Sequence, residues 1–398
     1  MKRVALIIET SNDYARGLLH GVRQYIRTHE PWSVQLVEQG RGGPPPRWLA
    51  RFRGDGVIAR IENAAVARAV RAAGLPTVDV SAARLLPELP MVETDNRAIA
   101  RLAADHLLKL GLTELAYCGD PSFGWSRERC QEFKACAASH GIEARVYPPR
   151  RSDGGQGMET QRAHLLRWVA SLPKPVGVMC CYDICGQQVL DACRELGLAV
   201  PDQVAVVGVD NDELLCELCE PSLSSVDLDS DRAGFEAARL LDGMMRGRAA
   251  PREPILIKPL RLVARASTVH PGIADPAVSL ALRFIHRHAQ QNIRVSQVVA
   301  ATGLGRRTLE IRFRKRVGRT LHEEIARLRM DHARELLRRL DLTVSQVSRR
   351  SGFTHPEYFS NAFRKATGLS PSQYRARVVA GREPDLVEEI VASKPPQP

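Results

Sequence analysis

Six polar side chains in the first 270 residues fall at or just past the ends of short apolar runs. They are Asn12, Tyr14, Arg16, Asp79, Asp183 and Asp210. A carboxylate accepts hydrogen bonds from two hydroxyl groups, and a guanidinium donates in a planar fork. Together with Arg129, these side chains therefore predict a site for a neutral, polyhydroxylated ligand such as a sugar. Trp125 is close to Arg129 in the chain and could cover the C–H face of that ligand.

Some of these residues also have a plain structural interpretation. An aspartate after a strand is often the N-cap of the next helix. The aspartates for which capping is the commoner role are Asp95, Asp183 and Asp229. For Asp210 and Arg129 we favour contact with the ligand. Trp125 could either stack on a sugar or fill its loop.

The last hundred residues contain two helix-turn-helix patterns, Val295–Gly318 and Val344–Gly368. In each, apolar residues at helical spacing lead to a turn glycine, Gly303 or Gly352, and then to a second helix. A long helix, Leu321–Arg339, is expected between the units and would fix the distance between their second helices. Two such units predict a protein that grips duplex DNA at two places.

The second helix of each unit leaves polar and charged side chains facing outward, and these are the candidate DNA contacts. In the first unit they are Arg306, Arg307, Thr308, Glu310, Ile311, Arg312 and Arg314. In the second unit they are His355, Pro356, Glu357, Tyr358, Ser360, Asn361 and Arg364. The arginines could read guanine or hold phosphates, and phosphate contact is the commoner use of arginine. Glu310 could accept from cytosine or hold a neighbouring guanidinium.

The charge of the chain is concentrated in the same segment. Residues Pro276–Val378 contain 21 Lys and Arg against 7 Asp and Glu, a net charge of +14. The whole chain carries +12, so the remaining residues sum to −2. A near-neutral body with a basic end is typical of a phosphate-binding domain attached to a neutral one. A merely solvated or membrane-adsorbed basic face is the alternative.

The first 270 residues alternate short apolar runs with helical patterns. The expected strands are Val4–Ile8, Val34–Val37, Gly56–Ile58, Thr77–Val80, Leu115–Cys118, Val176–Cys181 and Val204–Val209. The expected helices are Ala15–Arg27, Ala64–Ala73, Ala98–Leu110, Arg127–Ser139, Gln161–Ser171, Asp183–Leu196 and Arg232–Met245. This alternation predicts a doubly wound α/β architecture, in which ligands bind beyond the carboxyl ends of the strands. No dinucleotide fingerprint or phosphate-loop motif is present, which disfavours nucleotide ligands.

The C-terminal segment resembles the DNA-binding domain of the AraC family of transcription regulators. The resemblance covers about Pro276–Arg377 and is carried by Gly352-Phe353, the run Tyr358–Lys365, and the closing Gly368, Pro371 and Tyr374-Arg375. It implies that the two units enter successive major grooves on one face of the duplex, about one helical turn apart. A bundle of helices without DNA-binding activity is the alternative.

The first part resembles the sugar-binding domain of the LacI-type regulators and of the periplasmic binding proteins. The residues that carry this resemblance are Tyr14–Gly21, Asp55–Ile58, Thr94–Asn96 with His106-Leu107, and Val207–Asn211 followed by Leu223–Val226. It implies that Asp210 and Arg129 contact the sugar and that Asp79 lies at the cleft. Tyr182 stands where the family usually has Asn, so its contact with a sugar is in doubt. The first expected strand begins at Val4, which leaves no space for the N-terminal DNA-binding headpiece of the LacI pattern.

A LacI-like sensor continued by an AraC-type domain resembles a family of transcription activators that respond to the pentose D-xylose. The predicted fold class is a bilobed, periplasmic-binding-protein-like α/β sensor with doubly wound parallel sheets, followed by an all-α domain with tandem helix-turn-helix units. We expect the sensor at 1–270, a short Pro-containing linker at 271–276, the DNA-binding domain at 277–378, and a disordered tail at 379–398. The resemblance further implies a homodimer that binds operator DNA and engages RNA polymerase. A regulator of a different mono- or disaccharide is the alternative.

Other classes of function are disfavoured by what the sequence lacks. The nine cysteines show no zinc-type spacing, and there is no secretory or membrane-spanning run, so we expect free thiols, no metal, no cofactor and a cytoplasmic location. An enzyme would need a nucleophile with a placed base or a metal; the cleft carboxylates could at most mimic a glycosidase pair, and we expect no enzymatic activity. A DNA-packaging protein that senses nothing is a second alternative, which stabilisation by a ligand would exclude.

Overall fold

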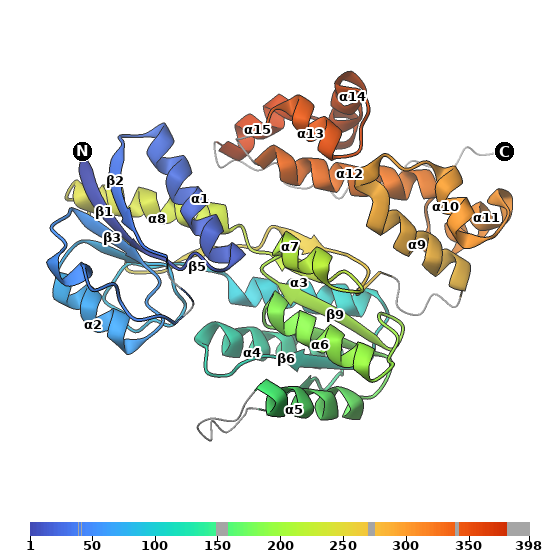
Figure 1. The fold of residues 1–398 in the computed structure, drawn as a ribbon, viewed down its shortest axis with the longest axis horizontal. Coiled ribbons are helices and arrows are strands. Elements are labelled where there is room, and N and C mark those ends of the chain that lie inside the picture. Colours follow the sequence, from blue (N-terminus) through green and yellow to red (C-terminus); the bar gives the residue numbers. More distant parts are fainter. Residues whose placement is uncertain (39, 41, 149–157, 270–274, 339–341, 380–398) are drawn as a thin grey trace. The chain divides into compact units, whose positions relative to one another are not determined.

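The computed structural model describes residues 1–398 apart from 39, 41, 149–157, 270–274, 339–341 and 380–398 (Figure 1). The chain divides into two compact units, Met1–Gly272 and Ile273–Pro398. Most of the predicted linker and nearly all of the predicted C-terminal tail lie outside the described residues.

The first lobe of the N-terminal unit is built on a four-stranded parallel sheet in the order β2-β1-β3-β4 (Figure 1). Its strands are β1 (Lys2–Ile7), β2 (Trp32–Leu36), β3 (Gly56–Ala59) and β4 (Thr77–Asp79). Its helices are α1 (Asp13–Thr28), the short 3-10 turn η1 (Leu49–Arg51), α2 (Ala64–Ala73) and, from later in the chain, α8 (Ser230–Met245). Strand β3 is apolar and buried over its whole length, and β1 is so from Val4 onward, as expected of a parallel sheet covered on both faces.

Helices α1 and α8 approach each other closely because three glycines lie between them. A Cβ atom on Gly21 would stand 1.9 Å from the carbonyl oxygen of Asp231, and a Cβ on Gly234 would stand 2.0 Å from that of Leu18. A Cβ on Gly17 would meet the Ser230 hydroxyl at 1.8 Å. The glycines of the Tyr14–Gly21 motif therefore serve packing, and they fix the start of α1, which carries Tyr14.

The second lobe contains a six-stranded sheet in the order β12-β10-β9-β8-β6-β7, parallel except for β12. Its strands are β6 (Leu115–Cys118), β7 (Arg145–Val146), β8 (Val176–Cys180), β9 (Val204–Val209), β10 (Ser224–Asp227) and β12 (Arg261–Val263). Its helices are α3 (Asn96–Lys109), α4 (Gly124–Ala138), α5 (Met158–Ser171), α6 (Asp183–Glu195) and α7 (Glu213–Leu218).

The chain passes between the two lobes three times, before α3, before α8 and before β12. A small two-stranded sheet of β5 (Val92–Thr94) and β11 (Ile255–Ile257) accompanies the crossings (Figure 1). Because the carboxyl ends of the parallel strands in both sheets lead towards these crossings, residues from both lobes can meet in one site.

The regular elements of the C-terminal unit are all helices within its described residues. Its helices are α9 (Pro276–His288), α10 (Val295–Thr302), α11 (Arg306–Val317), α12 (Leu321–Arg338), α13 (Val344–Arg350), α14 (Pro356–Thr367) and α15 (Pro371–Val379), with the 3-10 turn η2 (Ala289–Gln291) after α9. Phe313 of α11 and Phe359 and Phe363 of α14 are fully buried. Gly318 and Gly368 end α11 and α14 in the left-handed conformation, which glycine adopts without strain.

Helix α12 lies between the two helix-turn-helix units in the chain, and one of its side chains contacts residues from both halves of the C-terminal unit. The Arg329 guanidinium donates to the carbonyl oxygens of Ala289 (2.9 Å) and Ile293 (3.0 Å) from the first half, and it lies 6.0 Å from the ring centroid of Phe353 in the second. One half-buried cation thus bonds to the segment that precedes the first unit and lies over a ring at the turn of the second.

The predicted fold class is confirmed, and each of the seven predicted strands and seven predicted helices of the sensor corresponds to an observed element. The long helix predicted at Leu321–Arg339 is α12. The strands β5, β7, β10, β11 and β12 and the helices α7, α9 and α15 were not predicted.

Candidate ligand pocket and DNA-binding helices

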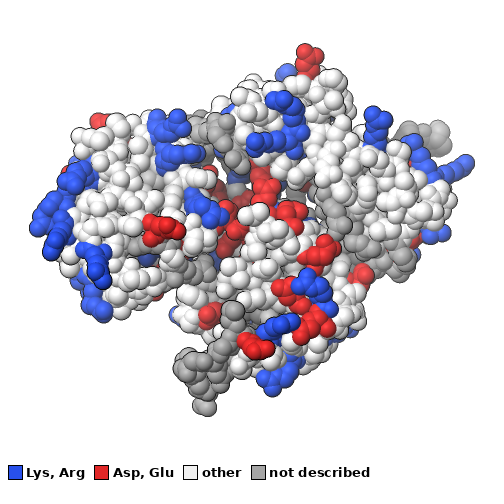
Figure 2. All heavy atoms as spheres, in the orientation of Figure 1, with Lys and Arg blue, Asp and Glu red and all other residues white. Residues whose placement is uncertain are grey.

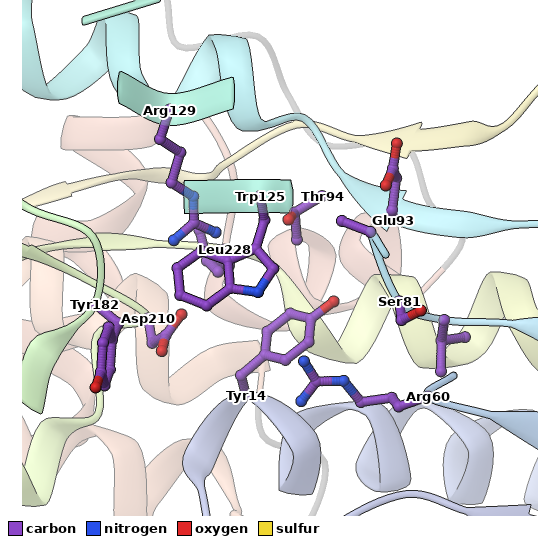
Figure 3. A pocket seen from close by; sticks show the side chains of 12 residues that line it. Tyr14, Arg60, Ser81, Glu93, Thr94, Trp125, Arg129, Tyr182, Asp210 and Leu228 are labelled. Carbon is purple, nitrogen blue, oxygen red and sulfur yellow. The ribbon is translucent and has the colours of Figure 1, made fainter. Parts of the chain in front are cut away.

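A cavity lies between the two lobes of the sensor, and its walls come from both (Figure 3). From the first lobe and the crossing strands it is lined by Tyr14, Arg60, Val80, Ser81, Ala82, Glu93 and Thr94. From the second lobe and the crossing before α8 it is lined by Trp125, Arg129, Tyr182, Asp210 and Leu228. Its empty space, counted out to the open mouth and including solvent there, is about 430 Å³.

Arg129 and Trp125 come from the first two turns of α4. The Arg129 Nε donates to Asn96 Oδ1 at 2.9 Å, and its Nη1 donates to the Cys181 carbonyl at 2.6 Å. The guanidinium carbon lies 5.0 Å from the centroid of the Trp125 ring, which also meets Tyr182 edge to face. These bonds hold the arginine in one orientation, so it is preorganised for a ligand.

Arg60 and Tyr14 form the opposite wall. The Arg60 guanidinium pairs with the carboxylates of Glu9 and Glu62 and stacks on the Tyr14 ring at 5.2 Å. Burial raises the pKa of Tyr14 to about 12, so its hydroxyl keeps its proton near neutral pH. The Arg60 Nε is buried and has no hydrogen-bond partner among the described residues.

Among the described residues, Glu93 of β5 carries an unpaired hydrogen-bond acceptor, whereas Arg60 carries an unpaired donor. The Glu93 Oε1 accepts from Arg84, whereas its buried Oε2 has no partner within the described part of the chain. Burial raises the pKa of this carboxyl, and the Arg84 guanidinium partly offsets the effect. Arg60 and Glu93, which both line the cavity, thus each carry one buried polar atom without a partner among the described residues. Buried polar groups are normally paired, so both atoms indicate a polar ligand or an ordered water in this cavity.

Asp210 lies directly after β9, on a turn with positive φ angles at Asp210 (108°) and Asn211 (52°). In Figure 3 its carboxylate lies between Tyr182 and Arg129 at the cavity. Four predicted sugar contacts, Tyr14, Trp125, Arg129 and Asp210, are thus brought together.

The other four predicted sugar contacts do not line the cavity, which corrects the prediction. Asn12 caps α1 by accepting from the Ala15 amide at 2.8 Å. Arg16 points back to the Thr10 carbonyl and to Asp13. Hydrogen bonds to groups at or near the start of α1 therefore hold both side chains.

Asp79 and Asp183 lie behind the cavity wall. Asp79 is fully buried, and its Oδ1 accepts from the amides of Ser81 (2.9 Å) and Ile61 (3.3 Å). Asp183 accepts from the Ser225 hydroxyl and the Asp212 amide, and it is not the cap of its helix. Burial, reinforced by the nearby charge of Asp210, raises the pKa of Asp183. Capping is observed for the other two doubtful aspartates, Asp95 and Asp229.

Several lining residues were missed by the sequence analysis. Arg60 directly follows β3, so the rule that selected Asp79 after β4 would have selected it too. Tyr182, which departs from the family pattern, lines the cavity. Glu93 and Thr94 lie on β5, a strand of three residues that has no apolar run by which it could be predicted. Thr94 belongs to the Thr94–Asn96 motif but was not selected as a contact, and Glu93 has no local signal, because its strand pairs with β11, more than 160 residues later in the chain.

The buried carboxyl of Asp79 makes stability depend on pH. Burial raises its pKa to about 7, from an unfolded value near ~4. The folded state therefore binds the proton more tightly, so this group favours folding fully below pH ~4, and that contribution is lost as the pH rises through 7. In Asp79→Asn, the free energy of unfolding should fall less between pH 4.5 and 7.5 than in the wild type, by at most about 1.4 kcal/mol per pH unit. Denaturant unfolding across this range measures it, with the exposed Asp202→Asn as control; equal pH dependence in all three proteins would refute it.

The candidate DNA contacts on α11 lie on its exposed face. Arg306, Arg307, Thr308, Ile311, Arg312 and Arg314 are exposed, and Glu310 is half-buried. Arg306 pairs with Glu310 at 2.9 Å, so this glutamate holds a neighbouring guanidinium, as one of the two interpretations expected. Arg312 lies 3.5 Å from Asp275. Ile311 is 61 % exposed.

Helix α14 has the same organisation. His355, Pro356, Glu357, Tyr358, Asn361 and Arg364 are exposed, and Ser360 is half-buried. Pro356 occupies the first turn, where its missing N–H costs little. The Ser360 hydroxyl donates to the Pro356 carbonyl at 2.9 Å, which satisfies its proton within the helix. Tyr358 is 64 % exposed and is the largest side chain offered on this face.

Positive charge is visible over the helical unit and also on the outer face of the first lobe (Figure 2). Exposed arginines of that lobe include Arg3, Arg51 and Arg53. The sensor therefore has a basic face on its first lobe, although its net charge is close to zero.

Arg307 offers a test that separates base reading from phosphate binding. If it reads a base, Arg307→Ala should cost about 1–3 kcal/mol at the operator and relax one base position. If it holds a phosphate, all sequences should be weakened alike and the salt slope should flatten by about one. Titration of selected and random duplexes at several salt concentrations distinguishes these results, with the exposed sensor residue Arg145→Ala as control. Unchanged affinity and slope would remove Arg307 from the interface.

Comparisons with known proteins agree with this organisation. Three family models match: an XylR N-terminal domain at residues 3–97, a periplasmic binding protein-like domain at 104–268 and a helix-turn-helix domain at 298–377. The xylose operon regulatory protein of Escherichia coli K12 is 31% identical over 390 residues, covering 94% of this chain and 96% of the relative. That of Haemophilus influenzae is 28% identical over 381 residues, covering 94% and 98%.

A solved structure, described as that of the xylose-binding transcription activator xylR, is 30% identical and has a TM-score of 0.62, covering 94% of this chain and 98% of that chain. A two-lobed sensor with a polar cavity, followed by paired AraC-type helix-turn-helix units, defines a ligand-responsive DNA-binding transcription regulator. The chain belongs to the family of the xylose operon regulatory proteins, which are sugar-responsive transcription regulators.

Two other features bear on the class of protein. Within the described ranges, no three His, Cys, Asp or Glu residues are arranged to hold a metal ion. The helices in the described part of the chain include none that is long and apolar enough to cross a membrane.

Proposed function

We propose that the sensor binds D-xylose in the interlobe cavity and that the bound sugar changes the affinity of the chain for operator DNA, so that it activates genes of pentose use. The observation that carries the proposal is the unsatisfied pair in the cavity wall, Arg60 Nε and Glu93 Oε2. A sugar hydroxyl both donates and accepts, so it can satisfy either atom. The names of the two relatives and of the solved structure support xylose as the sugar.

The charges of the cavity favour a neutral sugar over a sugar acid. Arg60 is already paired with two carboxylates, those of Glu9 and Glu62, and Glu93 is paired with Arg84. An additional carboxylate on the ligand would have to face Asp210 and Glu93 at close range, which costs energy in a buried site. Trp125 and Tyr182 offer ring faces and edges to the apolar side of the sugar.

The remaining roles follow from the family. We propose that the chain holds its sugar without converting it, uses no cofactor, acts in the cytoplasm, and works as a homodimer that binds repeated half-sites. Exposed residues of the DNA-binding unit or of the sensor would then contact RNA polymerase. Turnover of bound sugar would refute the first of these points.

A thermal unfolding series tests the effector. The purified full chain is melted with D-xylose, L-arabinose, D-ribose, D-glucose and cellobiose. A ligand at one hundred times its dissociation constant should add about 2.7 kcal/mol to the stability of the sensor. We expect D-xylose to stabilise most. Stronger stabilisation by another sugar would reassign the effector, and stabilisation by none would refute a sugar sensor.

The same series with two variants tests the observation that carries the proposal. Glu93→Gln keeps the shape of the side chain and removes its charge, and Arg60→Lys keeps the charge and removes the Nε donor. Both should lose most of the stabilisation by D-xylose. The exposed Glu143→Gln is the control and should retain it. Full stabilisation in Glu93→Gln and Arg60→Lys would show that the unsatisfied pair does not bind the sugar.

A further inference from the structure

Asp183 lies one layer behind the cavity, against the turn that carries Asp210. Its Oδ2 accepts from the Asp212 amide at 2.8 Å, and its Oδ1 accepts from the Ser225 hydroxyl at 2.5 Å. The same hydroxyl oxygen accepts from the Asn211 amide at 3.0 Å. One carboxylate and one hydroxyl therefore hold the two consecutive amides that follow Asp210.

The backbone of this turn needs such support. Asp210 and Asn211 both have positive φ angles, 108° and 52°, a region that non-glycine residues seldom occupy. Conformations of this kind persist where surrounding contacts over-determine them. The Asp210 amide adds a third contact by donating to the Val226 carbonyl of β10 at 3.0 Å.

The Asp183 carboxylate fits against β9 only because position 208 of that strand is a glycine, with no side chain. Gly208 of β9 pairs with Ser225 of β10, and a Cβ atom on Gly208 would stand 2.2 Å from Asp183 Oδ1. Asp183 and Ser225 are both buried. Three elements, the start of α6, β9 and β10, thus converge on the turn, and neither Asp183 nor Ser225 lines the cavity.

We propose that Asp183 and Ser225 are positioning residues of the effector site. They hold the turn 210–212 in the conformation that presents the Asp210 carboxylate to the cavity, and so they set the affinity for the sugar without touching it. This inference rests on the proposed sugar-sensing function.

Affinities for D-xylose measured by calorimetry on the full chain test the proposal. Ser225→Ala removes the hydroxyl, and Ser225→Thr retains it. We expect Ser225→Ala and Asp183→Asn to weaken binding about ten-fold or more, the effect of losing a hydrogen bond to a charged group, and Ser225→Thr to bind more tightly than Ser225→Ala. The control is Asp242→Asn, a buried, hydrogen-bonded aspartate of the first lobe far from the cavity lining. It should melt at a lower temperature and keep the wild-type affinity.

A double-mutant cycle distinguishes positioning from direct contact and from general destabilisation. If Ser225 acts through Asp210, Ser225→Ala should cost less than about two-fold in an Asp210→Asn background, because the two losses are not additive. Additive losses, or an affinity loss in Asp242→Asn equal to that in Ser225→Ala, would overturn the proposal. If the serine variants fail to fold, the same cycle is measured with Asp183→Asn in place of Ser225→Ala, and the same two outcomes apply. If the wild type binds D-xylose and neither Ser225→Ala nor Asp183→Asn loses affinity, the positioning role alone is refuted. If the wild type binds no sugar, the proposed function falls first.

Discussion

Replacement of Asp210 by alanine is expected to weaken D-xylose binding by one to two orders of magnitude. A charged acceptor in a desolvated site contributes about 1.5–3 kcal/mol, which corresponds to about 10- to 150-fold in affinity. Asp210 ends β9 at the cavity, between Arg129 and Tyr182 (Figure 3). Calorimetric titration with D-xylose measures the loss.

The neighbouring aspartate supplies the control for this prediction. Asp212 caps α7 by accepting from the Leu215 amide at 3.2 Å and does not line the cavity. Asp212→Ala should therefore cost about 1 kcal/mol of stability and leave the sugar affinity nearly unchanged. Binding of random-sequence DNA should be normal in both variants. Wild-type sugar affinity in Asp210→Ala would show that the cavity does not use this carboxylate.

Replacement of Phe363 by alanine is expected to unfold the second helix-turn-helix unit or nearly so. Phe363 is fully buried and packs between Phe359 and Tyr374, with ring centroids at 5.6 Å and 5.4 Å. Removing a buried phenylalanine costs about 3–5 kcal/mol, a large part of the stability of a small helical domain. Denaturant unfolding of the full chain followed by helical circular dichroism measures the loss, and operator affinity should fall with it.

A residue of the same helix controls for the effect of alanine itself. Tyr358 of α14 is 64 % exposed, so Tyr358→Ala should change stability by less than about 0.5 kcal/mol. Any loss of operator affinity in Tyr358→Ala without loss of stability would then report contact with DNA. Equal stability losses in the two variants would contradict the buried position of Phe363.

The fold was predictable from the sequence because its central elements carry strong local patterns. Strands such as β9, with five buried apolar side chains and one glycine, and helices such as α12, with an apolar stripe, can be recognised without knowledge of their neighbours. The short strands β5, β11 and β12 have three residues each and exist only through pairing with distant segments. Three residues are too few to show a periodic pattern, so their pairing could not be inferred.

The site was predictable only in part, for a physical reason. The rule that ligands bind past the carboxyl ends of strands finds Asp210, but it finds Asp79 and Asp183 equally well. Whether such a carboxylate faces the cavity or the turn behind it depends on side-chain direction and on partners from other elements, such as Ser225 for Asp183. Glu93 is the opposite case: it lines the cavity, but the rule did not select it, because its strand could not be predicted from the sequence.

The central claim is that sugar binding and DNA binding are coupled in this chain. The most direct test measures the affinity of the full chain for a duplex that it has selected from a random-sequence library, with and without saturating D-xylose, and the affinity for D-xylose with and without that duplex. By reciprocity both affinities must change by the same factor, typically ~5–150-fold. We expect a tightening within that range in both directions, absent in Asp210→Ala. Tight binding of D-xylose and of the duplex, with neither affinity changed by the other ligand, would contradict the account.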